Sequence, residues 1–180
     1  PLALLLIGIG LGLSMYLFAR GNKLSHGESG SDFCGAVFDQ TCDATLSSGY
    51  SHMLGLSVAG WGIVYFGMLA ALVVSAMAFR ELLQRSAISA ALLLNLAGLG
   101  MSGYFSFLFL SGTVPLCPLC LATHVTNLLL FGALVLYRGG SPFGFLADVR
   151  NGLAYVLVPG QQASAEQTAR LASFIALAFF

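Results

Sequence analysis

Four cysteines are the residues of this sequence best suited to chemistry. Cys117 and Cys120 form a Cys-x-x-Cys motif, a spacing that is typical of thiols that exchange electrons. Cys34 and Cys42 lie eight positions apart in a polar segment far upstream. The reactive form of a cysteine is the thiolate, which attacks a disulfide or donates electrons to an acceptor. The sequence therefore predicts thiol–disulfide redox chemistry.

Two other interpretations of the cysteines compete with redox chemistry. Cys34 and Cys42 could form a structural disulfide while Cys117 and Cys120 are small apolar core residues, since buried free cysteine is common. A zinc site of four cysteines usually contains two closely spaced pairs, which the eight-position spacing of Cys34 and Cys42 does not fit. We therefore expect no metal. Four cysteines allow three pairings, so the sequence leaves the resting disulfide undetermined.

A polar stripe follows the Cys-x-x-Cys motif along an otherwise apolar segment. Its steps of three, four and three positions place its members on one face of a helix, in the order Cys117, Cys120, His124 and Asn127. Asn95, in the preceding apolar segment, is expected to face the same interior. Two thiols, with hydrogen-bond donors one to two turns further along, suit two-electron reduction of a ring that carries carbonyl groups, such as a quinone. The alternative is that His124 and Asn127 only join packed helices by hydrogen bonds.

The elements that must position these residues are membrane helices. Hydrophobic residues make up 58% of the chain and charged residues 8%, whereas about a quarter of an ordinary soluble domain is charged. The segments 54–79, 88–110 and 116–137 are long enough to cross a bilayer, which takes roughly 20 helical residues, and the segment 2–19 is nearly so. We expect an all-α integral membrane fold, a four-helix transmembrane bundle over 1–137, with the start of a fifth transmembrane helix at 171–180. A formal net charge of zero gives no case for nucleic acid binding.

The basic residues predict the orientation of this bundle. Five of the seven lie in the segments 80–85 and 138–170, whereas two lie in the loop 20–56. Because cytoplasmic loops carry the excess of Lys and Arg, the loop 20–56 should lie outside, together with the turn 111–115. All four cysteines then lie near the outer surface, which is the oxidising side. We expect a bacterial inner membrane protein whose cysteines face the periplasm.

Two local features should control the reactivity of the cysteines. The Cys-x-x-Cys motif opens the fourth span, where the unpaired amides and the dipole of a helix N-terminus stabilise a thiolate, and Pro118 suits the first helical turn. In the segment 45–56, apolar residues recur at helical spacing, which predicts a half-helix lying on the interface. This lid would hold Cys42 over Cys117 and keep water from the pocket. His52 in the lid is as consistent with an exposed loop residue as with an active role.

Taken together, these motifs resemble the vitamin K epoxide reductase family, as a bacterial-type homologue. The resemblance covers about residues 34–130: the spacing of Cys34 and Cys42, the sequence CDATLSSGY at 42–50, the sequence GLSVAGWG at 55–62, and the Cys-x-x-Cys motif that opens a helix. Their order and topology make it specific. In the animal enzymes of the family, a tyrosine commonly stands where His124 stands here, and an asparagine stands near Val58.

The resemblance implies a quinone enzyme with a thiol relay. Cys34 would accept electrons from a thioredoxin-like partner, Cys42 would pass them to Cys117, and Cys120 would face the quinone. We expect ubiquinone, menaquinone or phylloquinone as the electron acceptor. The residues expected to contact it are His124, Ser48, Asn127 and Trp61.

The family also implies how the chain continues. Bacterial relatives often join the bundle through a fifth helix to a thioredoxin-like domain, so we interpret 138–180 as a cytoplasmic connector that ends in the start of that helix. The predicted function is a membrane thiol–quinone oxidoreductase that generates disulfides for oxidative protein folding. The alternatives are a quinone-epoxide reductase of the same family and a membrane scaffold or carrier with a structural disulfide, although a carrier should show internal repeats. Another family of disulfide-forming quinone reductases carries its Cys-x-x-Cys in the first outer loop, which does not fit this sequence.

Overall fold

The computed structural model describes residues 2–27, 41–78 and 84–139. Within them lie four helices that are long and apolar enough to cross a membrane, as predicted: α1 (Leu2–Ser25), α4 (Val58–Ala78), α5 (Gln84–Leu110) and α6 (Pro118–Arg138). Cys34, most of the connector 138–180 and the expected fifth span lie outside the described residues.

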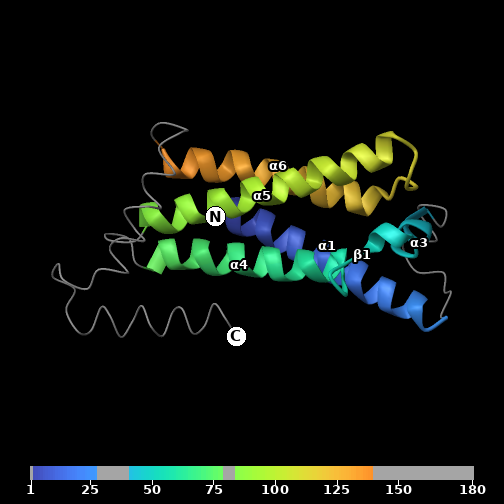
Figure 1. Ribbon diagram of the computed structural model, residues 1–180. Helices are drawn as coiled ribbons and strands as arrows, with labels where there is room; N and C mark the ends of the chain where they lie inside the picture. Colours follow the sequence, from blue (N-terminus) through green and yellow to red (C-terminus); the bar gives the residue numbers. More distant parts are fainter. Residues whose placement is uncertain (1, 28–40, 79–83, 140–180) are drawn as a thin grey trace.

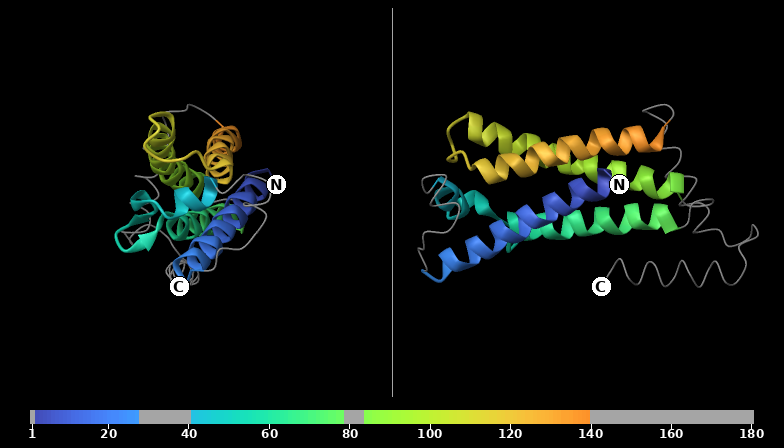
Figure 2. Two further views of the ribbon diagram at one scale, coloured as in Figure 1. Left: turned by 90° about the vertical axis from the view of Figure 1, so that its right-hand side faces the viewer. Right: turned by 180° about the vertical axis from the view of Figure 1, so that it is seen from behind.

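The four long helices form one bundle (Figure 1). Helix α1 packs against α4 and α6, and α5 packs against the same two helices. Viewed along its length, the bundle shows α1 inclined across the other helices (Figure 2). The short helix α3 (Thr41–Leu46) and the turn between α5 and α6 lie together at one end, on the right in Figure 1. We call this the cysteine end, because Cys42 and Cys117 lie there.

Part of the bundle interior is a packed apolar core. Its main cluster joins residues from all four long helices, among them Leu6, Phe66, Ile88 and Leu130. Because lipid tails are as apolar as leucine, such packing rests on close contact between the helices and not on exclusion of water. Gly10 of α1 allows that contact, since a Cβ atom there would lie 2.4 Å from the ring of Phe66.

Helix α1 extends further than the sequence predicted. It continues beyond the apolar segment 2–19 to Ser25, so the first residues of the segment 20–56 are helical. Arg20 belongs to the last turns of α1, where it is buried and paired with Asp43. The other boundaries differ less, since α4 begins at Val58 and α5 at Gln84.

The lid predicted as a half-helix over 45–56 has a different structure. Helix α3 ends at Leu46, a 3-10 turn, η1, covers Gly49–Ser51, and the antiparallel strands β1 (His52–Met53) and β2 (Leu56–Ser57) follow. The tight turn between the strands has positive φ at both central residues, 54° at Leu54 and 80° at Gly55, as a two-residue type I′ hairpin requires. The prediction of a half-helix is therefore wrong. The apolar residues do recur at helical spacing, but the chain forms a hairpin there, and the turn of that hairpin needs Gly55.

Candidate active site

The sulfur atoms of Cys42 and Cys117 face each other at the cysteine end. Cys42 belongs to α3, Cys117 is the residue that caps α6, and both side chains are fully buried. Their Sγ atoms lie 2.8 Å apart, which is longer than the S–S bond of about 2.05 Å. A small movement of either side chain would bring the two atoms to bonding distance. The chain therefore places Cys42 over Cys117, as the lid was expected to do.

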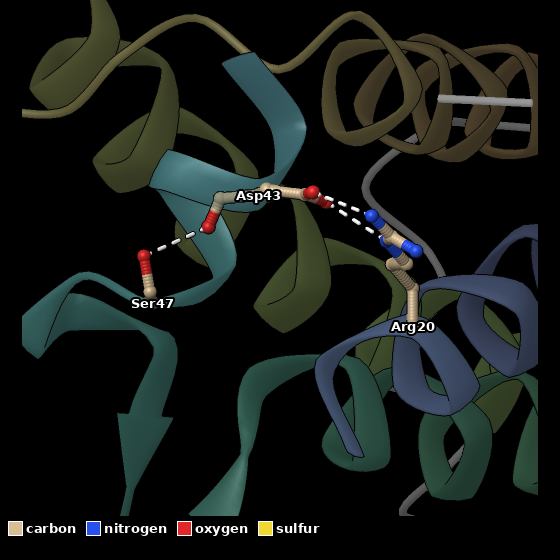
Figure 3. A network of polar contacts seen from close by, with 3 residues as sticks. All are labelled: Arg20, Asp43 and Ser47. Carbon is tan, nitrogen blue, oxygen red and sulfur yellow. Dashed lines mark hydrogen bonds and ion pairs between the residues drawn. The ribbon is translucent and has the colours of Figure 1, made fainter. Parts of the chain in front are cut away.

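An ion pair holds α3 against α1 (Figure 3). The Arg20 guanidinium donates from Nε to Oδ1 of Asp43 at 2.9 Å and from Nη2 to Oδ2 at 2.5 Å. Two parallel bonds of this kind fix the orientation of both groups. The Arg20 side chain is 2% exposed and that of Asp43 19%, so water screens the pair only in part. Because Asp43 follows Cys42 directly, the pair positions the helix turn that carries the sulfur.

A second bond holds α3 against the segment before α6. The Thr45 hydroxyl donates to the main-chain carbonyl of Pro115 at 2.7 Å. Helix α3 is thus held to α1 by Asp43 and to the Cys117 segment by Thr45. These two contacts fix the helix of Cys42 on both sides.

The Cys-x-x-Cys motif occupies the N-terminus of α6, as predicted. Pro118 is the first helical residue, and the backbone N–H of Cys120 donates to Sγ of Cys117 at 3.3 Å. A hydrogen bond with the Cys120 side chain, followed by burial, raises the pKa of the Cys117 thiol above its ordinary value. Both effects oppose the helix dipole, which favours a thiolate at the N-terminus of a helix.

A cavity of about 600 Å³ lies next to Cys120 and is open to the surface of the bundle. Such a volume falls in the range of about 300 to 1,000 Å³ typical of small-molecule sites. Of the three cysteines that the structure describes, only Cys120 lines this cavity. Apolar residues of α4 and α5 form much of the wall, and His124 and Asn127 of α6 supply polar groups. The Cys120 thiol and the ring of His124 thus line the same, mainly apolar cavity.

The His124 ring is held on several sides. Its Nδ1 lies 3.1 Å from the Ser102 hydroxyl of α5. The ring is parallel to Phe105 within 11°, with centroids 6.2 Å apart, and Phe109 lies 6.1 Å away at 45°. The His124 side chain thus points into the bundle, as predicted. Ser102, which the sequence analysis missed, fixes the position of Nδ1.

Asn127 and Asn95 meet in the bundle interior, as their positions predicted. The Nδ2 of Asn95 donates to Oδ1 of Asn127 at 2.7 Å, and the Tyr65 hydroxyl of α4 donates to the same oxygen at 2.6 Å. The other end of the Asn127 amide donates to Ser102 at 3.2 Å. Asn127 therefore serves as a hydrogen-bonded link between helices, although it also lines the cavity. Its expected contact with a quinone stays a prediction.

Tyr65 and Ser102 are the members of this network that sequence reasoning missed. Ser102 follows Asn95 by seven positions, which is two helical turns and hence the same face of α5. That spacing could have identified it. Tyr65 gave no comparable signal, because a tyrosine within an apolar span is usual near a membrane interface.

The remaining expected contacts lie at the rim of the cavity. Ser48 and Trp61 both line it. The Ser48 hydroxyl donates to the Thr45 carbonyl at 2.7 Å, and Nε1 of Trp61 donates to the Met53 carbonyl at 3.0 Å, which holds strand β1 against α4. His52 is exposed and lines the same rim. The quinone contacts of Ser48 and Trp61 stay predictions.

The comparisons with known proteins agree with the resemblance seen in the sequence. The sequence profile described as the vitamin K epoxide reductase family matches residues 1–135, well over half of the chain. No curated protein and no solved structure matches the chain.

Proposed function

The chain belongs to the vitamin K epoxide reductase family of integral membrane oxidoreductases that act on quinones, and we propose that it is a thiol–quinone oxidoreductase that forms disulfides. One observation carries the proposal: Cys120 lines the cavity and contacts Cys117, whose sulfur in turn faces that of Cys42. A scaffold or carrier would have no use for this series of thiols.

The thiols of Cys117 and Cys120 supply the electrons. In each turnover they lose two electrons and two protons and form one S–S bond, while the quinone is reduced to the hydroquinone. The Cys42 thiolate then attacks Sγ of Cys117, which forms a Cys42–Cys117 disulfide and releases the Cys120 thiol. Attack by the Cys34 thiolate on Cys42 yields a Cys34–Cys42 disulfide and restores the Cys117 thiol. A partner dithiol reduces that last disulfide and is itself oxidised.

The volume and the lining of the cavity suit a quinone. Its wall is predominantly apolar, and His124 offers a ring nitrogen to a carbonyl oxygen near Cys120. Val64 and Met68 of α4 and Met101 of α5 line the cavity and are also exposed on the surface of the bundle. A lipid-soluble molecule could thus enter from the bilayer. Ubiquinone, menaquinone and phylloquinone share the ring carbonyls and apolar tail that these features suit.

The partner and the location follow from the same chemistry. A thioredoxin-like protein or fused domain on the periplasmic side would deliver electrons to Cys34 and would in turn oxidise secreted proteins. The inner membrane of a bacterium provides both the quinone pool and an oxidising compartment. The Lys and Arg asymmetry supports this orientation.

The test compares two serine variants of the purified protein in detergent or vesicles. Cys120→Ser should abolish quinone reduction by a small dithiol, because the cysteine that lines the cavity is lost. Cys42→Ser should keep reduction by a small dithiol that reaches Cys117 and Cys120 directly, but should lose reduction by a thioredoxin-like protein. Undiminished turnover in Cys120→Ser would refute the proposed function. If Cys42→Ser lost quinone reduction by the small dithiol as fully as reduction by the thioredoxin-like protein, the relay would be refuted.

A further inference from the structure

A network of five polar side chains crosses the bundle from Tyr65 to His124. Its members lie on α4, α5 and α6 and are linked in the order Tyr65, Asn95, Asn127, Ser102 and His124. Amide and imidazole groups can each be drawn in two orientations, and the hydrogen-bond partners decide which is correct. One partner in this network is main-chain and can only accept, so the orientation of both amides can be worked out from it.

The starting point is Asn95, whose side chain is fully buried. One end of its amide lies 3.5 Å from the main-chain carbonyl oxygen of Asn127, 2.7 Å from Oδ1 of Asn127 and 2.9 Å from the Tyr65 hydroxyl. A carbonyl oxygen accepts and never donates. The end of the Asn95 amide that faces it must therefore be Nδ2.

The opposite end of the Asn95 amide supports this assignment. Its Oδ1 is buried and has no hydrogen-bond partner among the described residues. Reversing the amide would place an NH2 group there, with two buried hydrogens that lack acceptors. Orphaned buried N–H groups are rarer in proteins than under-satisfied carbonyl oxygens, so the observed orientation is the less costly one.

The orientation of Asn95 fixes that of Asn127. An atom that lies 2.7 Å from Nδ2 of Asn95 must be an acceptor, so it is Oδ1 of Asn127, which also accepts from Tyr65 at 2.6 Å. The Nδ2 of Asn127 then faces Ser102 and donates to its oxygen at 3.2 Å. A serine hydroxyl has one hydrogen to donate, and His124 Nδ1 lies 3.1 Å from the same oxygen.

We propose that Ser102 is a positioning residue that donates to Nδ1 of His124 and so holds the neutral ring with its hydrogen on Nε2. In a neutral imidazole one nitrogen donates and the other accepts, and the partner of one decides the state of the other. Among the described residues none bonds Nε2, and the ring lines the cavity next to Cys120. The ring is therefore preset to donate a hydrogen bond from Nε2 to a carbonyl oxygen. Quinone binding through that donor rests on the proposed function, whereas the tautomer itself does not.

Nitrogen-15 NMR of protein labelled at histidine tests the tautomer directly, in reduced protein that holds no quinone. The chain has three histidines, so the His124 signals are those that disappear in His124→Gln. In the unsubstituted protein we expect a protonated Nε2 and an unprotonated Nδ1. Ser102→Ala should raise the population that is protonated at Nδ1, whereas Ser102→Thr keeps the hydroxyl and should preserve the original pattern.

The steady-state kinetics of the same variants test what the tautomer does. Loss of one neutral hydrogen bond corresponds to roughly a 2- to 10-fold change in an equilibrium constant. Ser102→Ala should therefore raise KM for the quinone by about that factor, leave KM for the dithiol unchanged, and be rescued by Ser102→Thr.

Protonation of His124 at Nδ1 in the unsubstituted protein would overturn the proposal. So would spectra of Ser102→Ala that are identical to those of the unsubstituted protein, or a KM for the quinone that is unchanged in Ser102→Ala. Absence of quinone reduction in the unsubstituted protein would instead refute the proposed function. The NMR spectra, recorded without quinone, would still decide the tautomer in that case.

Discussion

The hydroxyl of Thr45 donates a 2.7 Å hydrogen bond to the carbonyl of Pro115 and so joins the helix of Cys42 to the segment that leads into Cys117. The two residues are 70 positions apart in the chain. This bond and the Arg20–Asp43 pair hold the sulfurs of Cys42 and Cys117 face to face, so each should affect how readily a disulfide forms between them.

Thr45→Val should lower the stability of the Cys42–Cys117 disulfide. The suitable background is Cys34→Ser with Cys120→Ser, in which neither neighbouring thiol can compete. One lost hydrogen bond costs about 1 kcal/mol, so the equilibrium constant against a glutathione buffer should fall about 5-fold. Mass spectrometry of alkylated protein measures the fraction oxidised. Thr45→Ser retains the hydroxyl and is the matched control, and equal oxidation of the valine and serine forms would contradict the prediction.

Arg20→Met should destabilise the bundle, because it leaves the Asp43 carboxylate without its counter-ion. Removing one partner of a largely buried pair costs about 3 kcal/mol. Thermal unfolding in detergent measures the loss. Arg85→Met is the control, since Arg85 is exposed near the start of α5.

Adding Asp43→Ala to Arg20→Met should recover part of this loss, because the unpaired charge is then removed. If Arg20→Met unfolded at the same temperature as Arg85→Met, the ion pair would have no structural role.

The raised pKa of Cys117 predicts that the reduced protein loses stability in alkali. The pKa of a thiol in the unfolded chain is about 8.5. In the folded protein, the hydrogen bond with Cys120 and burial raise the pKa of the Cys117 thiol above that value. Above about pH 8.5 the unfolded state binds fewer protons than the folded state, so stability should fall by about 1.4 kcal/mol per pH unit.

Unfolding midpoints between about pH 7 and 10, measured under reducing conditions, test this slope around the ordinary thiol pKa. Cys117→Ala lacks the group and should show a shallower dependence on pH. Parallel curves for the two proteins would show that the folded Cys117 thiol titrates as an unfolded one does.

The four spans and the polar face of α6 were predictable from the sequence because lipid leaves the chain few alternatives. A long apolar segment in a bilayer must satisfy its backbone hydrogen bonds internally, which makes it a helix. Spacing alone then places Cys120, His124 and Asn127 on one face. Their inward direction followed from the cost of exposing polar groups to lipid.

The features that the sequence did not predict depend on contacts between distant residues. The sequence did not show that α1 continues past Arg20, because the charge of Arg20 is accommodated by an ion pair with Asp43, which lies 23 positions away. The segment 45–56 has helical spacing, yet its hairpin depends on the backbone of Leu54 and Gly55. The link from Ser102 to His124 requires the relative rotation of α5 and α6, which no property of either segment alone encodes.

Gly62→Ala should weaken the packing of α4 on α1 beside the cavity. A Cβ atom at Gly62 would lie 2.6 Å from Oγ of Ser14 and 3.2 Å from its Cβ, and overpacking of this kind typically costs about 1 to 3 kcal/mol. Gly67→Ala on the same helix is the matched control, because nothing lies within 4 Å of the added atom there. Thermal unfolding should therefore separate the two alanine variants. Because the closest clash is with the serine oxygen, Ser14→Ala combined with Gly62→Ala should recover most of the loss, and a strictly additive double variant would mean that the clash lies elsewhere.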